Sequence, residues 1–464
     1  MLLTIAALLL SLAACNFTAR NSPFDEIDVP EDLDYYVDDD FIDIEDIDSS
    51  SDEEYVSQTQ QQPITISWWG GEWRHEATNE ALAKFEELNP DIKTSAHFGA
   101  WDGWEQYMAT GLMSGTASDV CQLSWDWLYL FTNFGQNPVL TDLNDFSDII
   151  ELTQFPDYAI KQCVINEEIL GIPVSTSGRL FLWNEATFER AGTSVPKTLE
   201  ELYTATTAIK NNLGDDHFPL VLGEYDRMIL MVYYLQSIYG KPWVVNNVLQ
   251  YSESEIAVGY DLFTEWEERG VIPTIFQLTS DGAQYLDVNP KWIDGRYGGV
   301  FEWDSFAPKY EIALDSDQRL VLGDFFPDFG GPFTHQGYGF SKISMVFSIA
   351  TTANDKENSA KLIEFLLNDD VGTSIMGSER GIPLSRKALE NTRNQGLLDE
   401  LTTEANQKVL NWVQFPLDPL FEDAELRFED GVYYRTFARV SANTATSAEA
   451  AKMLSDEITR VLQS

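Results

Sequence analysis

The sequence of 464 residues is short of positive charge. It holds 29 Lys and Arg against 76 Asp and Glu, for a formal net charge of -47. A chain this acidic repels nucleic acid and anionic lipid surfaces at long range, so we expect no nucleic-acid partner. The deficit is partly local, because no Lys, Arg or His occurs from Asn21 to Gln62, where Asp25 to Glu54 alone contribute sixteen acidic residues. Such a stretch repels itself, and residues 16–62 are predicted to be an acidic disordered linker, with docking on a partner as the alternative.

Cysteine and histidine are also scarce. Of three cysteines, Cys121 and Cys163 lie in apolar strand-like runs, where a buried free thiol is the common outcome, although the sequence leaves a disulfide between them open. The four histidines are scattered without the spacing of a metal site. We therefore expect no metal and no cofactor.

Long apolar runs are absent except at the N-terminus. The run "MLLTIAALLLSLAAC", residues 1–15, has the length and the small final residues of a secretion signal rather than of a spanning helix. "LAAC" matches the bacterial lipobox, which predicts that Cys15 is lipidated, although no Lys or Arg precedes Arg20. A buried apolar helix is the alternative. We expect a protein of the cell envelope, lipid-anchored to the outer face of the cytoplasmic membrane.

From Pro63 onward, short apolar runs alternate with helical periods, which is typical of an α/β fold. "ITISWW", "DIKTSAHF" and "DVCQLSW" are predicted strands, separated by helical "EATNEALAKFEELNP" and "WDGWEQYMATGLMSG". This order predicts parallel strands with right-handed crossovers, whose following loops open on one edge of the sheet. The loops contain "WGGEWRH", "GAWDGW" and "SWDWL", so three aromatic loops are predicted to converge where open α/β sheets bind ligands. A second α/β region is predicted from "TLEELYTATTAIKNNLG" onward.

Four segments in order closely resemble the solute-binding lipoproteins of carbohydrate ABC importers, the family of maltose- and multiple-sugar-binding proteins. They are "WWGGEWRHEATNEALAKFEELNPDIKT", "WDGWEQYMATGLMSGTASDVCQL", "EEILGIPVSTSGRLFLWNEATFERAG" and "WIDGRYGGVFEWDSF". The resemblance implies a two-lobed periplasmic-binding-protein-like fold of type II, with lobes joined by a hinge of crossing strands. We expect one lobe from residues 63–177 and 298–348, and the other from 178–297 and 349–464. The chain departs from the family pattern at Ser118 and Ser124, where relatives often carry proline and a carboxylate.

A sugar site needs flat aromatic rings for the C–H face of a pyranose and charged or planar groups for its hydroxyl rim. Each predicted loop offers both kinds, and the resemblance adds Trp303 as a stacking residue. The predicted ligand-binding residues are Trp69, Glu72, Arg74, Trp101, Asp102, Trp125, Asp126, Ser175, Thr176, Glu224, Trp243, Trp303, Asp304 and Tyr338.

Structural roles compete with these assignments. Strand alternation places Trp68 in the core, the helical pattern buries Trp104, and Trp73 could staple the start of a helix. Arg74 could pair with Glu72. Asp102 and Asp126 each stand where a helix N-cap is the default role.

The resemblance implies a monomeric binding protein, not an enzyme, that captures a carbohydrate between its lobes and delivers it to ABC permease subunits. Because the chain is so acidic, a neutral oligosaccharide is expected before a uronic-acid one, with Arg74 as the argument against. A binding lipoprotein that serves a sensor would look the same in sequence. A glycoside hydrolase with a carboxylate pair is the third alternative.

Overall fold

The computed structural model describes residues 62–132, 138–282, 285–327, 337–428 and 431–463, together with residues 329, 331 and 333. The predicted signal segment with Cys15, and the predicted linker apart from its last residue, lie outside the described residues. Within the described ranges, no helix has the length and apolarity needed to cross a bilayer.

Three parallel strands form the centre of the first part of the molecule. Strands β1 (Ile64–Trp69), β2 (Thr94–Gly99) and β3 (Val120–Ser124) are connected by helices α1 (Glu72–Leu88) and α2 (Trp104–Ser114). β1 pairs in parallel with both β2 and β3, which confirms the predicted βαβαβ order. The loops after the three strands therefore lie on one edge of the sheet.

Helix α1 begins at Glu72, directly after the glycine pair. Thr78, Ala81, Leu82 and Phe85 are buried, at the i, i+3, i+4, i+7 spacing of one helical face. Leu88, at the end of the helix, is 51% exposed. Trp68 on β1 is fully buried, as strand alternation predicted, and Trp104 is buried as well.

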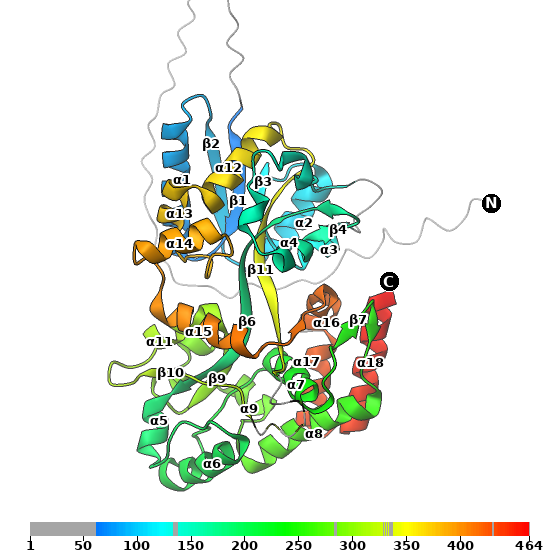
Figure 1. The fold of residues 1–464 in the computed structure, drawn as a ribbon. Coiled ribbons are helices and arrows are strands. Elements are labelled where there is room, and N and C mark those ends of the chain that lie inside the picture. The colour runs from blue at the N-terminus through cyan, green and yellow to red at the C-terminus, as the bar shows by residue number, and fades with distance from the viewer. Residues whose placement is uncertain are drawn as a thin grey trace, which may run out of the picture. The chain divides into compact units, whose positions relative to one another are not determined.

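Two long strands run between the halves of the molecule in Figure 1. β6 (Ile172–Asn184) pairs with the antiparallel β11 (Phe340–Ile349) from Ile172 to Gly178, and β11 continues the sheet onto β3. The second half of β6 instead pairs with β9 (Gly299–Trp303) and β10 (Leu320–Leu322). The sheet order is β10-β6-β11-β3-β1-β2, with β9 also on β6.

Further helices pack on both faces of the sheet around β1 and β3, which we call the first lobe. In Figure 1, α1 and α12 to α14 lie on one face and α2 to α4 on the other. The additional elements of this lobe are α3 (Trp127–Thr132), α4 (Asp157–Lys161), β4 (Val164–Ile165), β5 (Glu168–Ile169), α12 (Lys356–Asn368), α13 (Asp370–Met376), α14 (Arg386–Asn394) and the 3-10 turns Leu143–Phe146 and Leu152–Gln154.

The elements around β9 and β10 form the second lobe. It contains the two long helices α7 (Glu224–Tyr239) and α8 (Glu253–Arg269). The other elements are α5 (Glu185–Arg190), α6 (Leu199–Leu213), β7 (Val244–Val245), β8 (Val248–Leu249), α9 (Ile275–Ser280), α10 (Pro290–Ile293), α11 (Ala307–Ile312), α15 (Glu400–Trp412), β12 (Phe415–Pro416), α16 (Ala424–Arg427), α17 (Val432–Ser441), α18 (Ser447–Gln463) and the 3-10 turns Leu286–Val288, Asp304–Phe306 and Pro419–Glu422.

The contacts differ from the lobe boundaries predicted from the sequence. β9, predicted in the first lobe, pairs with the second half of β6. Helices α12 and α13, predicted in the second lobe, pack against each other and against α1. The apolar pattern of a strand or helix does not identify its partner, and β9 lies more than a hundred residues from β6, as α12 and α13 do from α1.

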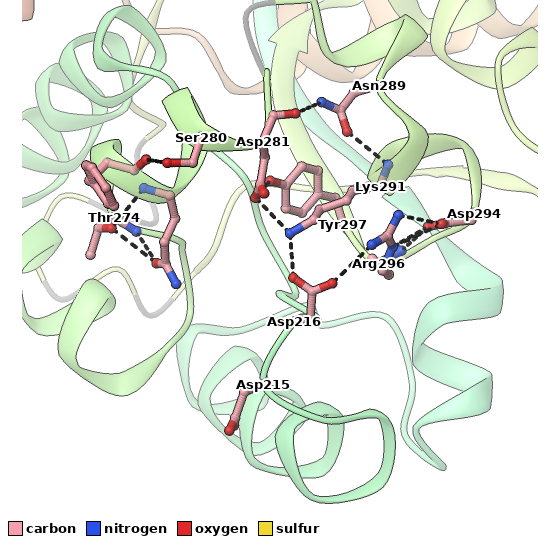
Figure 2. A network of polar contacts seen from close by, with 12 residues as sticks. Asp215, Asp216, Thr274, Ser280, Asp281, Asn289, Lys291, Asp294, Arg296 and Tyr297 are labelled. Atoms are coloured by element: carbon pink, nitrogen blue, oxygen red, sulfur yellow. Dashed lines mark hydrogen bonds and ion pairs between the residues drawn. The ribbon is translucent and has the colours of Figure 1, made fainter.

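A polar network fixes the segment that leads into β9 (Figure 2). Lys291 contacts Asp216 and lies 2.8 Å from Asp281, which also accepts a 2.7 Å hydrogen bond from the hydroxyl of Tyr297. Arg296 bridges Asp216 from the other side at 3.0 Å. Because Lys291 and Arg296 both contact carboxylates, the network has a structural role. Cys121 and Cys163 are buried free thiols.

Candidate functional site

Aromatic side chains gather where β1, β2 and β3 end. The ring of Trp101 stacks on that of Trp127 with centroids 5.5 Å apart, and its edge meets Trp69 at 5.2 Å. Trp69 and Trp127 are buried, whereas Trp101 is 43% exposed. Trp101 is thus a flat, partly exposed ring supported from behind by two others.

The third loop places its aromatic residues differently from the prediction. Trp125 is 1% exposed, and its indole donates a 2.7 Å hydrogen bond to the carbonyl of Gln162. Trp127, two residues later, turns toward Trp101 instead. The structure therefore does not bring Trp125 into the aromatic cluster. Trp127 begins α3, so the alternation of side chains along β3 no longer sets its direction.

A network of charged side chains crosses from one lobe to the other. Arg427 at the end of α16 lies 3.4 Å from Glu422 and, across the lobe junction, 3.3 Å from Glu105 on α2. Its guanidinium lies 6.0 Å from the ring of Trp101, and its Nε has no acceptor in the described part of the chain. Lys342 on β11 also contacts Glu422, at 2.7 Å.

Burial raises the pKa of Asp126 and of Glu105, two carboxyls of the first lobe beside this network. The charge of Glu422 raises the pKa of Asp126 further, while Ser124 donates a hydrogen bond to Asp126. Burial alone would also raise the pKa of Glu422, but Lys342 and Arg427 outweigh it and hold this pKa below its ordinary value. The junction therefore places carboxyl groups with raised and lowered pKa values side by side.

Trp303 supplies the second partly exposed ring, from the second lobe. The guanidinium of Arg179 lies 4.8 Å from its centroid and the ammonium of Lys342 lies 4.6 Å away. Arg179 also contacts Asp226 and lies 5.6 Å from the ring of Tyr225, whose hydroxyl donates a 2.7 Å hydrogen bond to Glu422. Trp303 and Trp101 are therefore linked through one polar network.

Asp304, the next residue, is buried and accepts hydrogen bonds from the hydroxyl of Ser177 at 2.5 Å, the amide of Asn406 at 2.6 Å and the backbone N–H of Ser305 at 2.9 Å. The backbone N–H of Gly178 also donates to it. Burial raises the pKa of Asp304 to about 6, although these donors act against the rise. Through these bonds, Asp304 connects β6, α15 and the turn that follows β9 at the lobe junction.

A cavity of about 510 Å³ adjoins Asp304 and is lined from both lobes. Trp73, 75% exposed, and Arg74 contribute from the first lobe, and Phe306 and Ile312 from the second. Ser175 and Thr176 lie in its wall, but the hydroxyl of Ser175 is already held by Ser344 and the carbonyl of Arg380. Glu224 lines a separate cavity of about 790 Å³ in the second lobe, together with Tyr225 and Tyr434.

Several predicted residues lie elsewhere or carry no interaction. Trp243 is 4% exposed and packs on Tyr251, and Tyr338 is fully buried with its hydroxyl on the carbonyl of Phe326, so neither lies at the lobe junction. Both belong to the core of the second lobe. Glu72, the first residue of α1, and Asp102, in the turn before α2, are exposed.

Sequence reasoning missed the charged residues that connect these groups. Arg179, Lys342, Glu422, Arg427 and Arg380 were not predicted. For Arg179 a signal existed, since one cation stands in the otherwise uncharged strand "IPVSTSGRLFLWN". Glu422 and Arg427 carry no such signal, because they follow short irregular elements near the C-terminus.

Two α/β lobes joined by crossing strands, with aromatic and charged side chains at their junction, define a solute-binding protein. The chain belongs to the bacterial extracellular solute-binding protein family, whose sequence profile matches residues 71–373. The predicted family and two-lobed α/β fold are thereby confirmed. Proteins of this family bind solutes and have no catalytic activity, which also confirms the prediction that the chain is not an enzyme.

Solved structures of similar proteins cover nearly the whole described chain. A periplasmic solute-binding protein from Pectobacterium atrosepticum is 27% identical with a TM-score of 0.80, covering 87% of this chain and 99% of its own. A periplasmic oligogalacturonide-binding protein from Yersinia enterocolitica, in complex with saturated digalacturonic acid, is 29% identical with a TM-score of 0.77, covering 86% and 98%. The sugar-binding protein MalE from Xanthomonas citri shares the fold at 16% identity and a TM-score of 0.66, covering 87% and 98%.

Proposed function

We propose that this protein captures an oligosaccharide between its two lobes and delivers it to the permease of an ABC importer. The observation that carries the proposal is the presence of two aromatic rings, Trp101 and Trp303, at the lobe junction. Each ring is partly exposed, each comes from a different lobe, and charged groups link the two.

The chemistry of these groups suits a carbohydrate. An aromatic ring covers the C–H face of a pyranose, while carboxylates and guanidinium groups form charge-assisted hydrogen bonds with its hydroxyls. Asp126, Glu105 and Glu422 supply acceptors, and Arg427 supplies donors. The carbohydrate ligand of the similar Yersinia protein supports the same class of solute.

Anchoring and delivery complete the proposal. A lipid on Cys15 would hold the protein at the outer face of the cytoplasmic membrane, and residues 16–62 would tether the lobes to it. A solute that contacts both lobes stabilises the conformation in which they are together, and the permease binds that conformation.

A thermal-shift screen tests the class of solute. Saturating ligand raises the melting temperature because it binds only the folded state, so an oligosaccharide at about a hundredfold over its Kd adds about 2.7 kcal/mol of stability. We expect a rise of several degrees with at least one oligosaccharide, lost in Trp303→Ala and kept in Trp243→Phe, whose tryptophan packs away from the junction. A response to peptides or amino acids alone would overturn the assignment.

A further inference from the structure

Carboxylates from both lobes face one another beside Trp101. Glu105 on α2 and Asp126 before α3 belong to the first lobe, and Glu422 precedes α16 in the second. Asp126 and Glu422 are buried, and the side chain of Glu105 is only 15% exposed. Burial raises the pKa of Asp126, and the charge of Glu422 raises it further from across the junction. Without a cation between them these groups would push the lobes apart, because like charges repel more strongly away from water.

Arg427 is the cation that lies among these carboxylates. Its Nη2 donates to Oε2 of Glu105 in the first lobe at 3.3 Å, and its Nη1 donates to Oε2 of Glu422 in its own lobe at 3.4 Å. Burial alone would lower the pKa of Arg427, but the surrounding carboxylates raise it, Asp126 included. One guanidinium group therefore bonds to both lobes, through a different nitrogen atom in each case.

The bonds of Arg427 are longer than those of the buried arginines that pair within one lobe. Arg179 lies 2.5 Å from Asp226, and Arg227 lies 2.5 Å from Glu267, both in the second lobe. The Nε of Arg427, by contrast, has no acceptor among the residues that the structure describes. The pairing of Arg427 is thus looser than that of a core arginine, which suits a contact that has to break whenever the lobes separate.

The same contacts connect the two partly exposed rings of the site. The guanidinium of Arg427 lies 6.0 Å from the ring centroid of Trp101. Its partner Glu422 also bonds to the ammonium of Lys342 at 2.7 Å, and this ammonium lies 4.6 Å from the ring centroid of Trp303. The pairing of Arg427 across the junction therefore influences how closely the two rings approach each other.

We propose that Arg427 is a positioning residue of the solute site, which pairs with Glu105 in the absence of solute and thereby holds the lobes together in part of the molecules. This inference rests on the proposed function, since it concerns the same site, and it adds how the empty site is arranged before solute binds. A partly exposed ion pair shifts an equilibrium by about fivefold at most. The solute must therefore add its own contacts before nearly all molecules have their lobes together.

Small-angle X-ray scattering of the solute-free full chain tests this pairing through a reversal of sign. Refolding from denaturant first removes any solute carried through purification. Glu105→Gln should increase the radius of gyration, because the pair across the junction is lost. Arg427→Gln should increase it more, because Glu422 then faces the carboxylates of the first lobe without a cation between them. When Glu105→Gln is added to Arg427→Gln, the radius of gyration should decrease, because the second change only removes a repelling carboxylate.

Two further variants separate this role from a loss of folding. Arg427→Lys keeps the charge and should restore most of the compaction that is lost in Arg427→Gln. Arg269→Gln is the control, because Arg269 is exposed and pairs with Glu265 on its own helix α8, so its loss should leave the radius of gyration unchanged. Melting curves of all variants verify that each is folded.

An unchanged radius of gyration in Glu105→Gln, or an increase from this change in both backgrounds, would overturn the inference. Because the measurement contains no solute, that result would leave the proposed function standing. Failure of every saccharide in the thermal-shift screen would instead contradict the proposed function, whatever the scattering of the solute-free variants shows.

Discussion

Asp304 is a buried carboxyl at the lobe junction, directly after Trp303. Its side chain gathers donors from β6, from α15 and from its own turn. Its pKa of about 6 lies above the ordinary value of 3.8. Between these two pH values, Asp304 is therefore protonated in the folded protein and ionised in the unfolded chain.

The sign of the resulting pH dependence follows directly. Protonated Asp304 stabilises the fold as pH falls below about 6, and this contribution is lost as pH rises through that value. Compared with Asp304→Asn, which cannot titrate, the wild type should gain up to about 3 kcal/mol of relative stability between pH 7.5 and pH 4. Melting temperatures of both proteins across this range measure the effect, and a difference that stays constant with pH would contradict it.

The tryptophans show how far single residues could be predicted from sequence. Strand alternation correctly buried Trp68, because a period of two fixes the face once the strand is known. It could not decide between Trp125 and Trp127, since the chain changes from strand to helix between them and the period changes with it. Trp243 was predicted at the site from its place after a helix, but the packing that buries it comes from Tyr251 and its neighbours.

At the scale of elements, β6 determines how the lobes are joined. Its first half pairs with β11 in the first lobe and its second half with β9 and β10 in the second. The βαβαβ order of the first lobe could be predicted because sequential parallel strands leave few arrangements. The partner of β9 could not, because this antiparallel pairing joins segments far apart in the chain without a turn between them.

Helices α7 and α8 offer a test of element packing. Arg227 on α7 is buried, contacts Glu267 of α8 at 2.5 Å and donates to the carbonyls of Leu222 and Pro273. Arg227→Met should destabilise the protein by about 3–5 kcal/mol, because Glu267, whose side chain is only 11% exposed, is left without its cation. Chemical denaturation provides the measurement.

Two controls sharpen this experiment. In the double variant Arg227→Met with Glu267→Leu, much of the stability should return, since an apolar pair replaces the ion pair. Arg269→Gln removes an exposed pair with Glu265 and should cost less than about 1 kcal/mol. A full loss in the double variant would show that Arg227 acts mainly through its backbone acceptors.

At the scale of the whole molecule, the proposed site exists only where the lobes meet. Trp101 and Glu105 belong to one lobe, and Trp303 and Arg427 to the other. A solute that contacts both groups binds more tightly when the lobes are together than when they are apart. This difference in affinity stabilises the conformation in which the lobes are together. Sequence predicted rings in both lobes, but it assigned Trp303 to the first lobe, and the second-lobe ring that it predicted, Trp243, is buried.

Small-angle X-ray scattering of the full chain, with and without a saccharide at saturation, tests this account most directly. Capture between the lobes predicts a smaller radius of gyration with ligand, and no decrease in Trp303→Ala at the same ligand concentration. An unchanged radius of gyration in the wild type, at a concentration where calorimetry shows the site to be full, would contradict it.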